Sequence, residues 1–291
     1  MLKKITLIGT GLMGYPMGVQ LLKAGYSLQV WNRTIDKVKG LEDLGAVVAS
    51  SPGEAARSAD VVITMLSNGE AVSDVLTSGG VAKAMKPGAI FVDMSSVTPS
   101  QAREHFEILS KHEISALDAP VSGGTKGAQS AQLAIMAGGD PDAFERVRPV
   151  LEAMGAPVLV GPTGTGALAK LANQAIVAVT ICAVAEATLL LEKGGADVPA
   201  VRKALAGGFA DSIILRQHGD RMTRRDFEPG GPCKMQLKDL NNLVNVAETL
   251  NLTLPHVEKA RSRFEDLCSR LDGGNLDHSA IFLELLDINK S

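Results

Sequence analysis

The sequence predicts an α/β fold whose second half is entirely helical. Apolar segments of strand length alternate with helical patterns through the first half, beginning with Lys3–Ile8 and Leu12–Ala24. Strand patterns stop at Gly161, where a turn of Gly, Pro and Thr opens a long apolar helix that we expect to reach Glu192. We therefore expect two domains, residues 1–161 and residues 162–291, joined through this long helix.

The first strand ends in a glycine-rich turn. Gly9, Gly11 and Gly14 have the spacing G-x-G-x-x-G, with a strand before them and a helix after them. The first glycine permits the tight turn, the second lets the backbone approach a pyrophosphate, and the third lets helix pack closely on strand. The first domain is thus predicted to be a Rossmann dinucleotide-binding domain.

The second strand, Ser27–Trp31, predicts which dinucleotide binds. An NAD-type site places Asp or Glu at the end of this strand, but here the chain continues with Asn32, Arg33 and Thr34. A guanidinium can pair with the 2′-phosphate of NADP, which a carboxylate would repel. We therefore predict NADP(H) over NAD(H). The alternative is that Arg33 is a surface residue and that cofactor choice is loose.

Further strands complete the predicted sheet, with helices expected from Pro52 and from Thr98. The strands are expected at Ala46–Val48, Asp60–Leu66, Ala89–Met94, Ile114–Asp118, Gln132–Met136 and Val158–Val160. Loops are expected at Ser67–Gly69, after the fourth strand, and at Ser95–Ser96, after the fifth strand. Both follow the carboxyl ends of strands, where open α/β sheets bind ligands.

The long helix contains the candidate catalytic residue. Lys170 and Asn173 are three residues apart near its start and so share one face. Burying a lysine is costly unless something pairs or uses it, although a lysine can also extend to solvent. Shorter helices are expected after it, at Val198–Ala206, Ser212–Met222, Gln236–Leu250, His256–Arg270 and His278–Asp287.

Composition excludes several classes of protein. A formal charge of −3 over 291 residues gives no basic excess for nucleic acid. The three cysteines and five histidines show no metal-ligand spacing, so no metal is expected. Because the chain starts directly with a strand pattern rather than a signal peptide, we expect a cytoplasmic protein. Thr180, Glu186 and Thr188 interrupt the apolar helix, which argues against a membrane span.

Two further segments offer groups for a substrate. Asp118–Gly124 follows a strand, and within it the Ser122 hydroxyl and the amides of Gly123 and Gly124 could cradle a carboxylate. Lys238, in the segment Lys238–Leu240, adds a second cation in the helical half.

Together these motifs resemble the β-hydroxyacid dehydrogenases of the 3-hydroxyisobutyrate dehydrogenase family. The resemblance rests on GxGxxG at Gly9–Gly14, DAPVSGG at Asp118–Gly124, GxxxKxxNQ at Gly166–Gln174 and KDL at Lys238–Leu240, and it covers the whole chain in order. Within the family, KLANQAIVAV and Asp277–Ala280 look most similar to the tartronate semialdehyde reductase branch. The segment NRT is similar to the NADPH-dependent glyoxylate and succinic semialdehyde reductases.

The resemblance implies a role for each matching residue. Lys170 would be the catalytic lysine, and Asn173 would orient the reacting oxygen. Ser122, Gly123, Gly124 and Lys238 would bind the substrate. The cofactor would contact Gly9, Thr10, Gly11, Leu12, Met13, Gly14, Asn32, Arg33, Thr34, Leu66, Ser96 and Lys238.

The resemblance also implies an activity and an assembly. We expect NADP(H)-dependent interconversion of a short carboxylated aldehyde, such as tartronate or succinic semialdehyde, and its hydroxy acid, in a homodimer or homotetramer. A 3-hydroxyisobutyrate- or 4-hydroxybutyrate-type dehydrogenase, or a non-catalytic NADP-binding scaffold, are the alternatives. Imine reductases share the architecture but generally replace the catalytic lysine, which Lys170 argues against.

Overall fold

The computed structural model describes residues 2–290 and divides the chain into two compact units. The first unit extends to Lys170 and the second begins at Leu171. The division falls inside the long helix α9 (Thr165–Lys193), whereas the sequence placed the boundary before that helix, at residue 161. The predicted fold class is confirmed, since a Rossmann-like sheet domain precedes a helical domain with α9 between them in the chain.

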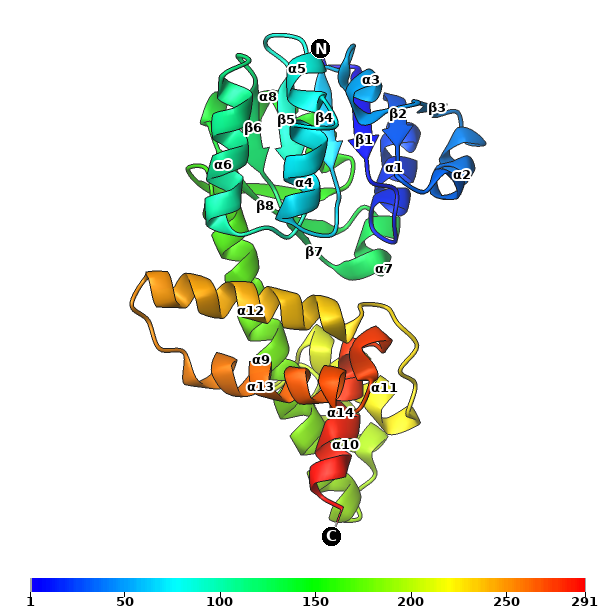
Figure 1. Cartoon of the computed structure of the whole chain (residues 1–291). Helices are drawn as coiled ribbons and strands as arrows, with labels where there is room; N and C mark the ends of the chain where they lie inside the picture. Colours follow the sequence, from blue (N-terminus) through cyan, green and yellow to red (C-terminus); the bar gives the residue numbers. More distant parts are fainter. Residues whose placement is uncertain (1, 291) are drawn as a thin grey trace. The chain divides into compact units, whose positions relative to one another are not determined.

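The first unit is built on a nine-stranded sheet in the order β3-β2-β1-β4-β5-β6-β8-β7, with β9 paired to β8 (Figure 1). Strands β1 to β6 run parallel, while β8 is antiparallel to β6 and β7. The strands are β1 (Lys4–Ile8), β2 (Ser27–Trp31), β3 (Val47–Val48), β4 (Val61–Thr64), β5 (Ile90–Asp93), β6 (Ser115–Asp118), β7 (Val121–Ser122), β8 (Leu133–Gly139) and β9 (Gly155–Gly161).

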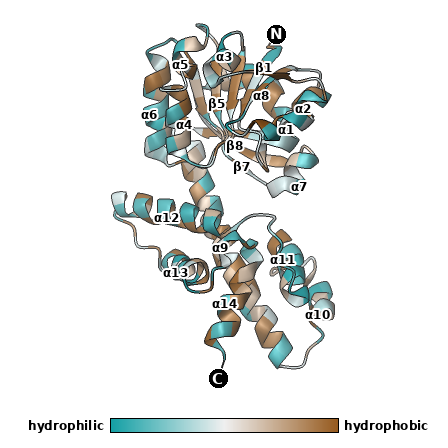
Figure 2. Ribbon diagram, turned by 45° about the vertical axis from the view of Figure 1, so that its right-hand side comes forward, coloured by the Kyte–Doolittle hydropathy of each residue, from teal (hydrophilic) through white to brown (hydrophobic). Residues whose placement is uncertain are grey.

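Helices cover both faces of this sheet. Every residue of β4 and β5 is buried, as expected for parallel strands packed on both sides. Figure 2 shows the central strands of the sheet as apolar and α6, on the outside of the sheet, as largely polar. The helices are α1 (Gly14–Lys23), α2 (Lys39–Glu42), α3 (Pro52–Ala56), α4 (Gly69–Leu76), α5 (Val81–Ala84), α6 (Pro99–Ser110), α7 (Gly124–Gln129) and α8 (Pro141–Glu152), with a 3₁₀ turn η1 at Ile35–Lys37.

The second unit is all helical among its described residues. Its core packs one side of α9 against later helices, with Ile181, Phe264 and Phe282 fully buried. The helices are α10 (Val198–Leu205), α11 (Ile213–Arg224), α12 (Cys233–Thr249), α13 (Pro255–Ser269) and α14 (Ile281–Ile288), with 3₁₀ turns η2 (Gly273–Asn275) and η3 (His278–Ala280).

Helix α9 is long and apolar enough to cross a membrane by length and composition alone. The core helix of a soluble protein meets the same criterion, and 44% of the apolar window of α9 is buried within the structure.

Candidate active site

The glycine-rich turn has the geometry that a dinucleotide needs. Gly9 has a φ of +99°, and a Cβ on it would lie 2.4 Å from the Met65 carbonyl oxygen. A Cβ on Gly14, the first residue of α1, would lie 1.9 Å from the Gly9 oxygen. Packing therefore requires glycine at both positions. A Cβ on Gly11 would meet no atom of residues 2–290 within 4 Å, so glycine there keeps open the space that a pyrophosphate would use.

The residues flanking the central glycine differ in exposure. Thr10 is buried, whereas Leu12 is exposed. Met13 is the N-cap residue of α1.

Asn32 connects the carboxyl ends of β1 and β2. Its Oδ1 accepts a hydrogen bond from the Thr10 N–H at 3.1 Å, and its Nδ2 donates to the Thr34 carbonyl at 2.9 Å. Asn32 therefore shapes the loop that follows β2. Arg33 and Thr34 in that loop are exposed to solvent.

The loops after β4 and β5 are tied together by side chains. The Leu66 N–H donates to Ser95 Oγ at 2.9 Å, and the Ser95 N–H donates to Asp93 Oδ1 at 3.0 Å. Thr64 Oγ1 also donates to Asp93 Oδ1, at 2.8 Å. Leu66 is thus held against Ser95, the residue before the half-buried Ser96, at the carboxyl ends of adjacent strands.

Ser122 is the last residue of β7, and Gly123 and Gly124 follow it with φ values of +131° and +61°. These values favour glycine. Ser122 is half-buried and both glycines are exposed, so their polar groups are accessible as the predicted carboxylate cradle requires.

The first turn of α9 is anchored on the sheet of the first unit. Asp118, at the end of β6, accepts hydrogen bonds from the Gly164 N–H at 2.8 Å and the Ala167 N–H at 2.7 Å. A Cβ on Gly166 would lie 2.2 Å from the Asp118 carbonyl oxygen and 2.4 Å from that of Met136, so the helix backbone touches β6 and β8. Lys170, four residues after Gly166, lies on the same helix face and is half-buried.

Burial raises the pKa of Asp118 to about 6, although both amide hydrogen bonds oppose the shift. The carboxyl group that anchors α9 therefore titrates at a higher pH than an ordinary aspartate.

In the second unit, polar side chains connect α9 to α12. Gln174 Nε2 donates to Gln236 Oε1 at 3.1 Å and to Asp239 Oδ2 at 2.8 Å. Lys238 Nζ lies 3.1 Å from Asp239 Oδ1. Asp239 therefore contacts both Lys238 and Gln174, and Gln174 is the residue that follows Asn173. Asn173 itself is half-buried.

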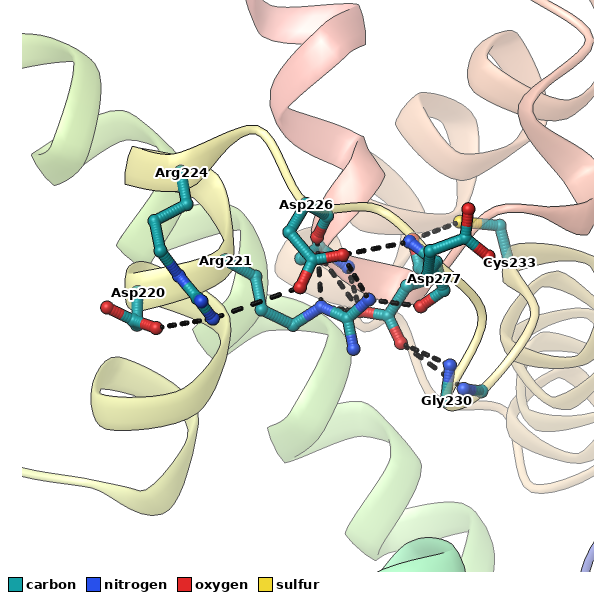
Figure 3. A network of polar contacts seen from close by, with 10 residues as sticks. Asp220, Arg221, Arg224, Asp226, Gly230, Cys233 and Asp277 are labelled. Carbon is teal, nitrogen blue, oxygen red and sulfur yellow. Dashed lines mark hydrogen bonds and ion pairs between the residues drawn. The ribbon is translucent and has the colours of Figure 1, made fainter.

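The loop before α12 is fixed by Asp277 (Figure 3). Asp277 Oδ2 accepts from the N–H groups of Gly230 and Gly231 at 3.0 and 3.2 Å, and Arg221 Nε lies 3.5 Å from Oδ1. Cys233 Sγ contacts the Asp277 carbonyl at 3.1 Å. The start of α12, the helix of Lys238, is thus braced by the segment that begins η3.

The predicted residues therefore fall into two groups. In the first unit they lie at or next to the carboxyl edge of the sheet, where strand ends are joined by backbone hydrogen bonds such as Gly9 N–H to Trp31 and Ala119 N–H to Asp93. In the second unit Asn173 and Lys238 lie on the helices that Gln174 connects.

Sequence reasoning assigned no role to four residues that support these groups, namely Asp93, Asp118, Gln174 and Asp239. Each is polar and buried, which implies a hydrogen-bond partner, but each has at least one partner that lies 29 to 65 residues away in the chain.

Two protein-family models match the chain. Residues 4–164 match the model described as the NAD binding domain of 6-phosphogluconate dehydrogenase. Residues 164–285 match the model described as NAD-binding of NADP-dependent 3-hydroxyisobutyrate dehydrogenase.

Similar proteins extend over the whole chain. It is 41% identical to 2-hydroxy-3-oxopropionate reductase of Escherichia coli, with 99% of each chain covered. It is 38% identical to the probable mitochondrial 3-hydroxyisobutyrate dehydrogenase-like 1 of Arabidopsis thaliana, over 98% of this chain and 86% of that protein. The structure of Mycobacterium tuberculosis 3-hydroxyisobutyrate dehydrogenase with L-serine superposes with a TM-score of 0.89 at 33% identity, covering 98% of this chain and 99% of that one. The chain therefore belongs to the 3-hydroxyisobutyrate dehydrogenase family of NAD(P)-dependent β-hydroxyacid dehydrogenases.

Proposed function

We propose that the protein is an NADP(H)-dependent reductase that interconverts a short carboxylated aldehyde, such as tartronate semialdehyde, and its hydroxy acid. The observation that carries this proposal is Lys170, a half-buried lysine on the helix that Asp118 and Gly166 anchor to the Rossmann sheet. The full-length similarity to 2-hydroxy-3-oxopropionate reductase supports the choice of substrate class.

Lys170 supplies the acid–base chemistry in this proposal. When bound, the nicotinamide supplies the hydride for reduction. Negative charge then develops on the aldehyde oxygen, and the Lys170 ammonium stabilises that charge and donates a proton to it. In the reverse direction the neutral amine accepts the hydroxyl proton. Asn173, one turn further along α9, orients the same oxygen.

The remaining residues hold the substrate. Ser122, Gly123 and Gly124 present a hydroxyl and backbone amides to the substrate carboxylate, and Lys238 adds a positive charge whose position Asp239 fixes. A site built this way selects substrates that carry a carboxylate close to the aldehyde.

Oxidation of NADPH with a panel of aldehydes tests the proposal. We expect turnover with tartronate and succinic semialdehydes and none with uncharged aldehydes of the same length. Preference for methylmalonate semialdehyde would instead favour a 3-hydroxyisobutyrate-type dehydrogenase, the activity in the names of two relatives. No turnover with any member of the panel would favour a non-catalytic NADP-binding scaffold.

Replacing Arg33 by alanine tests the cofactor. The open space at Gly11 and the arginine after Asn32 fit a dinucleotide with a 2′-phosphate, and the second matching family model is described as NADP-dependent. A charge-assisted hydrogen bond contributes roughly 1.5–3 kcal/mol, so the Kd for NADP⁺ is expected to rise about 10- to 100-fold. The Kd for NAD⁺ should stay the same.

Isothermal titration measures both constants, and Lys37→Ala, an exposed lysine in the next turn, is the matched control. Equal affinity of the native protein for NADP⁺ and NAD⁺ would defeat the assignment.

We further propose a homo-oligomer that buries one face of α9. Ala172, Ile176, Ala183, Ala187 and Leu190 are exposed at helical spacing, with Ile176 and Leu190 at 68% and 74% exposure. Exposed apolar residues that share one face of a helix are typical of interaction sites. Light scattering during gel filtration should show a dimer or tetramer that Leu190→Asp dissociates. Leu44→Asp, on an exposed leucine of the first unit, should leave the assembly intact, and a monomeric native protein would contradict the proposal.

A further inference from the structure

A small internal cavity lies behind the carboxyl edge of the sheet in the first unit. Its volume is about 10 Å³, and it is lined by residues of β5, β6 and α6 together with Thr163. Two lining side chains, Asp93 and His105, are each only 3% exposed. Neither belongs to the catalytic or substrate-binding residues named above.

Asp93, which lines the cavity, uses only one of its two carboxylate oxygens in hydrogen bonds. Oδ1 accepts hydrogen bonds from Thr64 Oγ1 and from the Ser95 N–H. Oδ2 is buried and has no hydrogen-bond partner within residues 2–290. Burial raises the pKa of Asp93, although both Ser95 and Thr64 favour the charged form.

His105 is arranged in the same way. Its Nε2 lies 2.9 Å from Ser73 Oγ in α4, and the Gly69 carbonyl at the start of α4 also accepts a hydrogen bond from the ring. Because Nε2 has a polar contact and Nδ1 has none within residues 2–290, we assign the hydrogen of the neutral ring to Nε2, which leaves a lone pair on Nδ1. That Nδ1 is buried and lacks a partner within residues 2–290. Burial lowers the pKa of His105, which favours this neutral ring.

The two unpartnered atoms face each other at a distance too long for a direct hydrogen bond. Asp93 Oδ2 and His105 Nδ1 are 3.9 Å apart. If a water oxygen lay about 2.8 Å from both atoms, the angle Oδ2–water–Nδ1 would be about 90°, close to the angle between the two hydrogens of water. The cavity volume is at the lower limit of what one water needs, and buried polar atoms of this kind are normally satisfied.

We propose that one internal water bridges Asp93 Oδ2 and His105 Nδ1, and that this Asp93–water–His105 bridge positions the cofactor-binding loops. The water donates one hydrogen to Nδ1. Toward Oδ2 it donates a second hydrogen when the carboxyl group is ionised, or accepts one when it is protonated. The same geometry thus serves both protonation states of Asp93.

The bridge connects the loops that the cofactor is expected to contact. Through Asp93 it reaches Ser95, whose Oγ accepts from the Leu66 N–H. Through His105 it reaches Ser73 and Gly69 in α4, which begins directly after the loop that contains Leu66. Removing the bridge should loosen the loops after β4 and β5. The role in positioning rests on the proposed function, whereas the water itself does not.

A crystal structure at high resolution tests the water, and nitrogen NMR of the His105 ring tests its tautomer. We expect a single peak of density within hydrogen-bond distance of both atoms and a proton on Nε2. No density between the two atoms, or a proton on Nδ1 in the neutral ring, would overturn the proposal.

Cofactor binding tests the positioning role. Asp93→Ala is expected to raise the Kd for NADPH about tenfold, and His105→Leu about threefold, while kcat at saturating cofactor changes less than about twofold. Asp93→Asn keeps the shape and Oδ1, so it should fold normally and raise the Kd by an intermediate factor.

Asp60→Ala is the matched control. Asp60 also accepts backbone N–H bonds, from Lys3 and Lys4, but it lies at the amino end of the sheet. The Asp60→Ala variant should have a lower melting temperature and an unchanged Kd for NADPH. If Asp93→Ala and Asp60→Ala both lower the melting temperature and neither changes the Kd, Asp93 is structural only. A protein that binds NADPH normally but reduces no aldehyde would refute the proposed reaction and leave these binding measurements valid.

Discussion

Replacing Lys170 by alanine is expected to lower kcat/KM for aldehyde reduction by a factor of about 10³ to 10⁴. The variant loses both the charge that stabilises the developing oxyanion and the proton donor, which together account for about 4–5.5 kcal/mol of the activation barrier. The Kd for NADPH, measured by titration, should change less than about threefold, because the glycine-rich turn and Asn32 lie on other elements.

Two further variants separate the contributions of Lys170. Lys170→Arg keeps a positive charge but cannot release a proton near neutral pH, so it should recover only a small part of the activity. Lys193→Ala removes an exposed lysine from the other end of α9 and should leave kcat/KM unchanged. Undiminished turnover in Lys170→Ala would remove the general-acid role and with it the proposed mechanism.

The parallel strands could be predicted because they are buried on both faces. Strand β2 runs from Ser27 to Trp31 as predicted, and β4 and β5 lie within the predicted apolar runs. Strand β9 is longer than the predicted Val158–Val160. It pairs only with β8 and alternates between half-buried and exposed residues, so it has no continuous apolar run that would mark its ends in the sequence. Gly155 and Pro157 conceal that alternation in the sequence, and such residues are tolerated at a sheet edge.

Loop residues were harder to assign than strands. Gly69 was placed in a loop after the fourth predicted strand, but it is the first residue of α4. The sequence signal for the start of this helix was Asn68, whose Oδ1 accepts a hydrogen bond from the Ala71 N–H and caps the helix. The last predicted helix, from His278 to Asp287, likewise begins as a 3₁₀ turn and becomes α14 only at Ile281.

Local sequence motifs revealed the residues of the candidate site. The hydrogen bonds that position these residues depend on partners far along the chain. Asn32 was predicted to contact the cofactor from its position after a strand, yet its hydrogen bond reaches Thr10, 22 residues earlier. The strand Ala89–Met94 was predicted without a role for Asp93, since nothing near it in the sequence indicates its hydrogen bond with Thr64 or its closeness to His105. Only the register of neighbouring strands brings such residues together.

In the second unit, a buried ion pair is the interaction whose loss should destabilise the fold most. Arg263 in α13 donates to Glu284 Oε2 in α14 from Nε at 2.9 Å and from Nη2 at 2.7 Å. Its Nη1 donates to Glu186 Oε1 in α9 at 2.7 Å. Arg263 and Glu284 are 5% and 2% exposed, so water cannot replace either partner. The guanidinium thereby joins three helices of the unit.

Glu284→Ala is expected to destabilise the protein by roughly 3–5 kcal/mol, because it leaves the Arg263 charge buried without its main partner. For a chain of this size, this corresponds to a fall in melting temperature on the order of 10 °C. Differential scanning calorimetry measures the change, and the transition of the second unit is the one that should move.

Two comparisons show whether burial of the charge is the cause. Glu186 contacts the same guanidinium but its side chain is 63% exposed, so Glu186→Ala should cost less than about 1 kcal/mol. Replacing both buried partners, Arg263→Met with Glu284→Leu, removes the charge together with its counterion and should restore most of the stability lost in Glu284→Ala. If the double variant is no more stable than Glu284→Ala, the loss comes from packing between α13 and α14 rather than from an unpaired charge.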